Sequence, residues 1–168
     1  MLYSCVTTYF DSAIAFFAFP LVTCLLWQRF PFECTFGASS ALASHTDVTG
    51  FSFLGHLHEM LDGKLSCHVH AQRVPVIPQA LDYADEFLLT AAGQRNRNHT
   101  GPFVKFDGVP FAMEEVLFDP QTSGGLLIAL PGDQAAALRA ELRELGLPAE
   151  IVGELTERRE TEILVTND

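Results

Sequence analysis

From residue 44 onward the hydrophobic positions alternate between helical and strand-like spacing. In 51–61, apolar side chains recur every three or four residues and Gly63 follows as a stop, which predicts a helix. The same reasoning predicts helices over 78–89, 111–117 and 132–145 and strands over 65–69, 103–106, 126–130, 149–155 and 162–166. This order indicates an α+β domain with a mixed sheet of about four strands.

Two polar stretches interrupt this pattern. Residues 91–102, AAGQRNRNHTGP, carry two glycines and predict a polar loop. Residues 118–125, FDPQTSGG, predict a turn-rich loop. That loop leads directly into the continuous apolar run 126–130, which is typical of an interior strand.

The N-terminal segment differs from the rest of the chain, so we place a boundary after residue 43. Residues 12–27, SAIAFFAFPLVTCLLW, carry no charge and are interrupted by Pro20. A spanning helix needs about 20 apolar residues, and no basic residue precedes the run as in a signal peptide. Three interpretations stay open: a buried helix pair, a marginal membrane segment, or sequence outside the fold from a misplaced start or shifted frame.

Composition narrows the possible partners. Apolar residues make up 48% of the 168 residues, and the formal net charge is −11. Such a balance argues against a nucleic-acid backbone as partner, although an acidic site can hold phosphate through a divalent metal. The four cysteines form no CxxC pair, which is typical of reduced thiols in a cytosolic protein. We therefore expect a cytoplasmic protein, with a membrane unlikely as partner.

The stretch HTDVTGFSFLG at 45–55 places a carboxylate, Asp47, just before the first expected helix. Asp47 or Thr49 could cap that helix by accepting from its unpaired N–H groups. Alternatively, Asp47 could bind Mg²⁺, which is usually held by one or two carboxylates together with phosphates and water. Gly50 would let a phosphate approach the helix start, whose partial positive charge favours an anion.

The other candidates each have a structural alternative. The DPQTSGG loop could present N–H groups to an anion, but it lacks the lysine of a GxxxxGK[ST] loop. Arg95 and Asn96 could contact phosphate or lie in a solvated loop. His68 and His70 would share one face of a strand, but two ligands without a third do not make a zinc site.

Two stretches taken together resemble a known family. HTDVTGFSFLGHLHEM at 45–60 and LFDPQTSGGLLIALP at 117–131 are similar, in order and spacing, to the C-terminal half of the selenophosphate synthetases, or selenide, water dikinases. The usual family form has Gly where this chain has Ser52. The resemblance covers roughly 44–168 and extends more broadly to two-domain ATP-dependent enzymes of purine and thiamine biosynthesis.

The resemblance implies a fold and an activity. It implies the C-terminal domain fold of the aminoimidazole ribonucleotide synthetase-like superfamily, a layered α/β sandwich beside an N-terminal ATP-binding domain in a homodimer. It implies an ATP- and Mg²⁺-dependent phosphotransferase that converts selenide, ATP and water to selenophosphate, AMP and phosphate. It also implies that Asp47 is a metal ligand, in a corner shaped by Thr46, Thr49 and Gly50.

The chain also departs from that family. Residues 1–43 do not resemble the family's N-terminal domain, which carries a Gly-rich segment with a reactive Cys or selenocysteine, a Lys and further Asp ligands. Cys5 has no such neighbours, so we assign it no catalytic role. We expect little or no activity from this chain alone. Alternatives are a non-catalytic module that dimerises with or regulates a full-length synthetase, half of a split enzyme, or a related purine- or thiamine-pathway enzyme.

Overall fold

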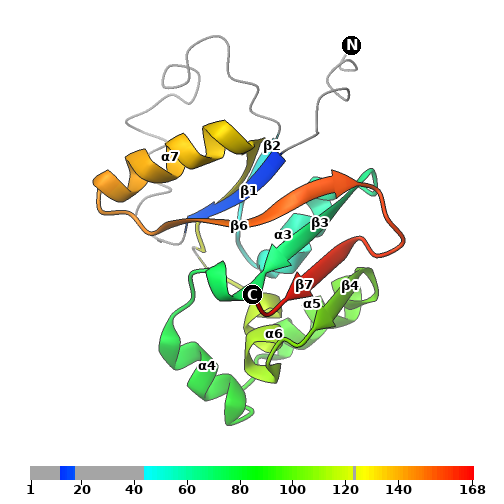
Figure 1. The fold of residues 1–168 in the computed structure, drawn as a ribbon. Helices are drawn as coiled ribbons and strands as arrows, with labels where there is room; N and C mark the ends of the chain where they lie inside the picture. Colours follow the sequence, from blue (N-terminus) through cyan, green and yellow to red (C-terminus); the bar gives the residue numbers. More distant parts are fainter. Residues whose placement is uncertain (1–11, 18–43, 123) are drawn as a thin grey trace.

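The fold is built on one mixed sheet (Figure 1). The computed structural model of the chain describes residues 12–17, 44–122 and 124–168. Within them seven strands follow the order β2-β5-β1-β6-β3-β7-β4. The strands are β1 Ser12–Phe17, β2 Ser44–Asp47, β3 Leu65–His70, β4 Val104–Asp107, β5 Leu126–Pro131, β6 Ala149–Glu157 and β7 Ile163–Thr166. β7 runs parallel to β3 and β4, and the other pairs are antiparallel.

Helices lie on both faces of this sheet. They are α3 Ser52–Leu61, α4 Pro78–Asp85, α5 Ala91–Thr100, α6 Phe111–Phe118 and α7 Gly132–Glu144, with short 3-10 turns Ala71–Arg73 and Gly101–Phe103. The α+β class is confirmed. The sheet has seven strands rather than about four, because β1 and β2 join those that the hydrophobic pattern predicted.

Strand β5 shows how the two faces differ. Leu127 and Ala129 point into the main core, which lies under α3 and α6, whereas Ile128 and Leu130 pack with Ala135 of α7 on the opposite face. All four β5 residues are buried, as expected for an interior strand that pairs with β2 on one side and β1 on the other. A continuous apolar run therefore marks a strand covered by helices on both sides.

The segment 12–17 is a strand, so a buried helix pair, one of the three open interpretations, is wrong for these residues. β1 pairs with β5 and with β6. A short apolar run is compatible with an interior strand as well as with a buried helix, and its periodicity alone does not distinguish the two. Residues 18–27 lie outside the described residues. Among the helices that the structure describes, none is long and apolar enough to cross a membrane. The boundary after residue 43 stays a prediction.

The polar stretch 91–102 is the other correction. Its first ten residues form the helix α5 rather than a loop. Gly and Asn are poor helix formers, but tertiary contacts outweigh that preference. Thr90 caps the helix by accepting from the Gly93 N–H, and Arg97 pairs with Glu114 and Glu115 of α6. The expected helix over 78–89 is shorter, since α4 ends at Asp85.

Candidate functional site

The two stretches singled out in the sequence meet in one corner of the sheet. Strand β2 ends at Asp47, which lies opposite Leu126 of β5. Beyond that pair, the Val48 N–H donates to the Gly125 carbonyl and the Gly124 N–H donates back to the Val48 carbonyl, both at 2.9 Å. The loop after β2 and the DPQTSGG loop are thus joined through their backbones, about 70 residues apart in sequence as counted from Asp47 to Asp119.

Helix α5 ties this corner to the rest of the domain. The Asn96 side-chain amide donates to the Gly50 carbonyl at 3.0 Å and to the Phe118 carbonyl at 3.1 Å. The Gln121 N–H adds a bond to the Thr49 carbonyl at 3.0 Å. Two separate segments, α5 and the DPQTSGG loop, therefore hold the residues that follow Asp47.

Gly124 explains why the second loop needs a residue without a side chain. A Cβ atom there would lie 2.8 Å from the Val48 carbonyl oxygen and 2.8 Å from Cβ of Gln121. No side chain fits at that separation from a backbone oxygen. The glycine lets the two loops approach closely enough to form their hydrogen bonds.

Asp47 is the exposed carboxylate of this corner, and the capping interpretation is wrong. Helix α3 has Phe51 at its N-cap position with no side-chain cap, because a turn closed by the Ser52 N–H on the Thr49 carbonyl separates the helix from β2. Asp47 ends a strand and Val48 beside it is buried, which fixes the backbone at this point.

A single exposed carboxylate fits part of an Mg²⁺ site. Mg²⁺ takes one or two carboxylates and completes its shell with phosphates and water. Within the described residues, Asp47 belongs to no group of three metal-ligating side chains. Asp47 could therefore supply one oxygen to a metal whose other ligands come from substrate or from further protein. Thr46 and Gly50 precede and follow it in the chain, and the expectation that they shape a metal site with Thr49 stays a prediction.

A row of hydrogen bonds that begins at Thr49, two residues after Asp47, was not anticipated from the sequence. The Thr49 hydroxyl lies 3.0 Å from Nε2 of His56, whose Nδ1 lies 3.0 Å from a carboxylate oxygen of Glu59. His56 is buried and packs edge-on against Phe51 at 5.7 Å between ring centres. The i, i+3 spacing of His56 and Glu59 on an expected helix was the available signal. This row orients the hydroxyl of Thr49, which follows Asp47 by two residues in the chain.

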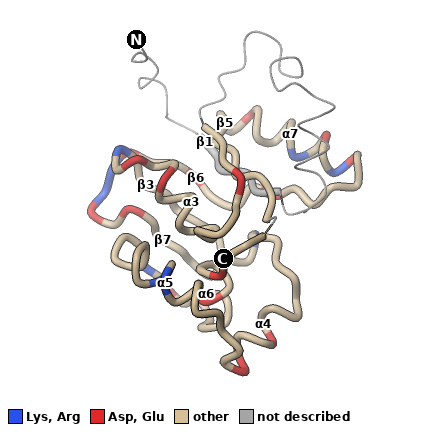
Figure 2. The backbone as a smooth tube through the Cα atoms, turned by 180° about the vertical axis from the view of Figure 1, so that it is seen from behind, with Lys and Arg blue, Asp and Glu red and all other residues tan. Residues whose placement is uncertain are grey.

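Arg95 and Asn96 have different surroundings. Both amide hydrogens of Asn96 go to protein carbonyls, which leaves its oxygen as an acceptor. Arg95 is exposed, and none of the hydrogen bonds that join the corner involves it. In the backbone tube of Figure 2, α5 carries positions coloured as basic residues, whereas the charged positions of α4 are coloured as acidic ones. A phosphate contact by Arg95 or Asn96 stays a prediction.

Cys67 is no candidate nucleophile. It is a free thiol inside the main core. Burial, followed by the negative charge of Glu154, raises the pKa of the Cys67 thiol far above its usual range. Cys5, Cys24 and Cys34 lie outside the described residues.

The strand pair His68 and His70 lies apart from this corner. Both residues are on β3, and β6 lies between β3 and β1 in the sheet. The two imidazole rings lie on one face of β3, with 4.6 Å between their centres. Glu154 of β6 faces both rings and supplies the third group that the sequence did not reveal. Strand pairing across 84 residues cannot be seen in local spacing.

Comparison with known proteins gives consistent matches. Residues 29–166 match the family model described as AIR synthase related protein, C-terminal domain. The chain is 57% identical over 121 residues to the selenide, water dikinase of Agathobacter rectalis, which covers 71% of the chain and 35% of the relative. It is 43% identical over 120 residues to the selenide, water dikinase of Desulfitobacterium hafniense, a match that again covers 71% of the chain and 35% of the relative.

A third relative and one solved structure extend these matches. The selenide, water dikinase of Clostridium botulinum (strain Eklund 17B) is 32% identical over 140 residues, which covers 82% of the chain and 40% of the relative. A thiamine-monophosphate kinase structure from Stenotrophomonas maltophilia is similar with a TM-score of 0.46 and 15% identity, covering 92% of this chain and 50% of that one.

The chain thus spans about a third of the length of the curated relatives it matches. Its family model covers 29–166, which includes both hydrogen-bonded loops and the strands on which they are built. The resemblance noted in the sequence is confirmed at this level. The chain belongs to the family of AIR synthase related proteins, as a C-terminal domain of that family.

Proposed function

We propose that this chain provides the C-terminal domain of an ATP- and Mg²⁺-dependent selenide, water dikinase. The observation that carries the proposal is the exposed Asp47, held where two hydrogen-bonded loops meet. The names of the relatives support selenide as substrate of a phosphate transfer, and ATP as the phosphate donor is part of the proposal. A buried free thiol agrees with a reducing compartment, and we expect the protein in the cytoplasm.

In this proposal Asp47 offers one carboxylate oxygen to a magnesium ion that also binds the phosphates of ATP. Bound Mg²⁺ would neutralise charge on the phosphates during transfer. The pairing of Asp47 with Leu126 and the backbone bonds of Val48 to Gly124 and Gly125 hold the chain that carries the carboxylate, so its position would change little on binding. The Thr49 hydroxyl, fixed by His56, would hydrogen-bond to metal-bound water or to a phosphate oxygen.

We further propose that the chain alone has little or no dikinase activity. One carboxylate is too few to hold the metal ions that bridge ATP phosphates. The test supplies ATP, Mg²⁺ and selenide to the purified chain and follows AMP and selenophosphate by phosphorus NMR. Turnover at the rate of a full-length relative would defeat this part of the proposal.

The role of Asp47 is tested separately, in a chimera. Residues 44–168 replace the matching segment of the Agathobacter rectalis enzyme, which is 57% identical to this chain. We expect an active chimera and a loss of about 100-fold or more in kcat on Asp47→Asn. The control is Asp62→Asn, at an exposed residue with φ of 49°, a conformation that Asn tolerates. Equal activity of the two variants would refute the metal role.

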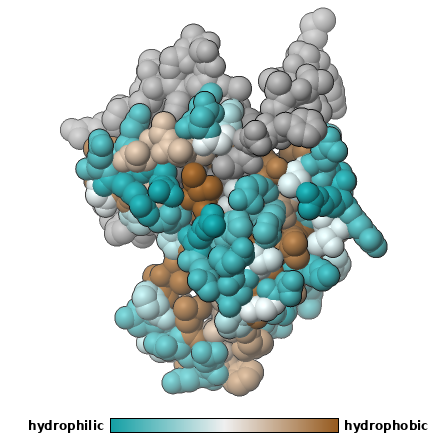
Figure 3. All heavy atoms as spheres, in the orientation of Figure 1, coloured by the Kyte–Doolittle hydropathy of each residue, from teal (hydrophilic) through white to brown (hydrophobic). Residues whose placement is uncertain are grey.

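A second candidate is association with another subunit, either a copy of this chain or a full-length synthetase. The segment around α4 exposes large apolar side chains, among them Ile77 at 71% and Phe87 at 73%. Phe87 packs on Phe111 of α6 at 5.3 Å between ring centres, which continues the apolar surface. Figure 3 shows hydrophobic residues on the surface beside α4. Such patches are typical of protein interfaces.

Light scattering after size-exclusion chromatography tests this candidate. We expect a dimer of the chain, or a complex after mixing with a full-length synthetase. Phe87→Asp should weaken the association, whereas Glu86→Gln, at the adjacent exposed position, should not. A monomer that does not co-elute with a full-length synthetase would exclude the second candidate.

A further inference from the structure

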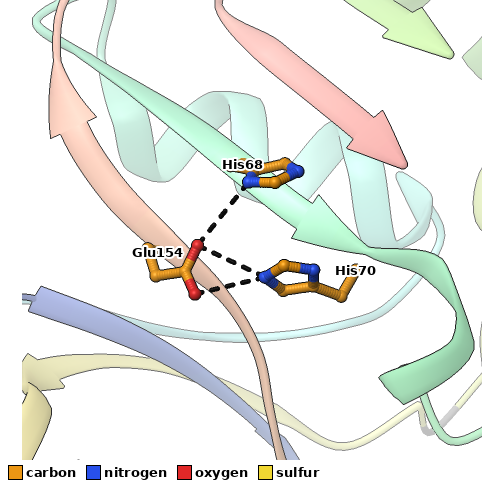
Figure 4. Close-up of side chains that lie close together, drawn as sticks. All are labelled: His68, His70 and Glu154. Atoms are coloured by element: carbon orange, nitrogen blue, oxygen red, sulfur yellow. Dashed lines mark hydrogen bonds and ion pairs between the residues drawn. The ribbon is translucent and has the colours of Figure 1, made fainter. Parts of the chain in front are cut away.

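Three metal-ligating side chains converge on the central part of the sheet (Figure 4). His68 and His70 come from β3, and Glu154 comes from β6 directly opposite His68. Within the described part of the chain, these three form the one group of His, Cys, Asp and Glu residues whose ligand atoms all lie within 4.8 Å of one another. They lie on the face opposite to the main core, since Cys67 and Val69 point into that core.

The separations suit one tetrahedral ion. Zinc bonds to His nitrogen and to carboxylate oxygen are close to 2 Å, so neighbouring ligand atoms around zinc lie about 3.3 Å apart. One oxygen of Glu154, Oε2, lies 3.3 Å from Nε2 of His70 and 3.6 Å from Nδ1 of His68. Both nitrogen–oxygen edges of the tetrahedron are therefore present before any ion binds.

The remaining ring nitrogens are held by outer groups. Nε2 of His68 lies 2.8 Å from the Thr166 hydroxyl, and Nδ1 of His70 lies 3.1 Å from a carboxylate oxygen of Asp168. The Thr166 hydroxyl in turn donates to Asp168. A carboxylate only accepts hydrogen bonds, so Asp168 accepts from both Nδ1 of His70 and the Thr166 hydroxyl. The Thr166 hydroxyl in turn accepts from Nε2 of His68. Both rings therefore carry a proton on the outer nitrogen.

That direction leaves the inner nitrogens, Nδ1 of His68 and Nε2 of His70, to face Glu154. In a neutral imidazole with one nitrogen protonated, the other nitrogen carries a lone pair. Nδ1 of His68 and Nε2 of His70 then point lone pairs toward the oxygens of Glu154. With both rings neutral, three acceptors face one another, and a metal cation can take the place that a ring proton donated to Glu154 would otherwise occupy. Histidine ligands whose other N–H is held by a carboxylate or hydroxyl are the usual arrangement around bound zinc.

We propose that His68, His70 and Glu154 bind one divalent transition-metal ion of the zinc class, with a fourth position open to water. Two imidazoles and one carboxylate suit zinc, cobalt or nickel and not Mg²⁺, which prefers oxygen ligands throughout. Glu154 is half exposed, which gives an ion access from solvent. The ion would cross-link β3 and β6, while Thr166 connects the site to β7. This site is separate from Asp47 and does not depend on the proposed dikinase function.

Metal titration of the full chain tests the proposal. Cys5, Cys24 and Cys34 are first replaced by Ser, so that thiols outside the described residues bind no metal. After removal of metal with a chelator, Co²⁺ is added and its visible absorption reports a tetrahedral site, and Zn²⁺ is then added in competition. We expect one ion per chain and a rise in the thermal midpoint with Zn²⁺.

The variants separate this site from incidental binding. We expect Glu154→Gln and His70→Gln to lose the cobalt spectrum, and Thr166→Val to weaken affinity by about 10- to 100-fold. The matched control is His99→Gln, an exposed histidine on α5, which should bind as the parent does. Circular dichroism checks folding, and His68→Gln replaces any variant that does not fold. Absence of bound metal in the parent, or binding that survives in both Glu154→Gln and His70→Gln, would overturn the proposal.

Discussion

Gly153 is the position where the sheet tolerates no side chain. On β6 it lies opposite Val69 of β3. A Cβ atom there would lie 2.2 Å from the His68 carbonyl oxygen and 3.1 Å from the His68 carbonyl carbon. Non-bonded atoms of this kind pack at about 3.5 Å. Both close neighbours belong to backbone, so relief requires the two strands to separate by more than about 1 Å.

The cost of Gly153→Ala follows from that geometry. Overpacking typically costs 1–3 kcal/mol when side chains can adjust. Here no side chain can move to relieve the contact, so we expect a loss at the upper end, about 3 kcal/mol of unfolding free energy. In a domain of this size each kcal/mol lowers the thermal midpoint by about 2–4 °C, which gives about 6–12 °C.

Urea denaturation followed by far-UV circular dichroism measures the loss, and calorimetry gives the midpoint. The matched control is Gly101→Ala. Gly101 has φ of −50°, and an added Cβ would meet only Cγ of Arg97, at 3.9 Å. We expect Gly101→Ala to remain within about 0.5 kcal/mol of the parent. If Gly153→Ala were as stable as Gly101→Ala, the close approach of β6 to β3 would be wrong.

Three further predictions concern the corner and the core. Asn96→Ala removes two hydrogen bonds and should cost about 1–3 kcal/mol by urea denaturation, whereas exposed Asn98→Ala should cost almost nothing. Ser52 has φ of 71°, so Ser52→Gly should be more stable than Ser52→Ala by about 1 kcal/mol in the same assay. Cys67 should resist alkylation until the chain unfolds, as read by mass spectrometry of its peptide. Burial raises the pKa of the Cys67 thiol, so above pH about 8.5 only the unfolded chain loses the thiol proton. The free energy of unfolding should therefore fall as the pH rises above about 8.5, and this fall should be smaller in Cys67→Ala. Rapid native labelling of Cys67 would contradict its burial.

Elements with a strong apolar period were predictable. Helix α3 and strand β5 begin and end within a residue of where their sequences place them. Helix α5 was not predictable, because its sequence is polar and contains Gly93. Its contacts explain both features: Thr90 caps it and donates to Asp119 at 2.7 Å, and a Cβ on Gly93 would lie 3.1 Å from the Thr90 hydroxyl oxygen.

The candidate site was predictable as two separate stretches and not as one corner. Asp47 and the DPQTSGG loop each had a structural interpretation, and local spacing could not show that β2 pairs with β5. The same limit applied to Glu154, which meets His68 only through the pairing of β3 with β6. Contacts between distant segments depend on strand order, and short-range patterns do not encode that order.

Strand β1 has a practical consequence for anyone who shortens this chain. It lies between β5 and β6, and these two strands form no ladder with each other. A separate chain beginning at residue 44, with no relative's sequence joined before it as in the chimera, would leave two half-sheets, β2-β5 and β6-β3-β7-β4, each with a bare interior edge. Such edges recruit any strand within reach. The shortened protein would exchange strands with its own copies or precipitate, and an added SAIAFF peptide should restore it.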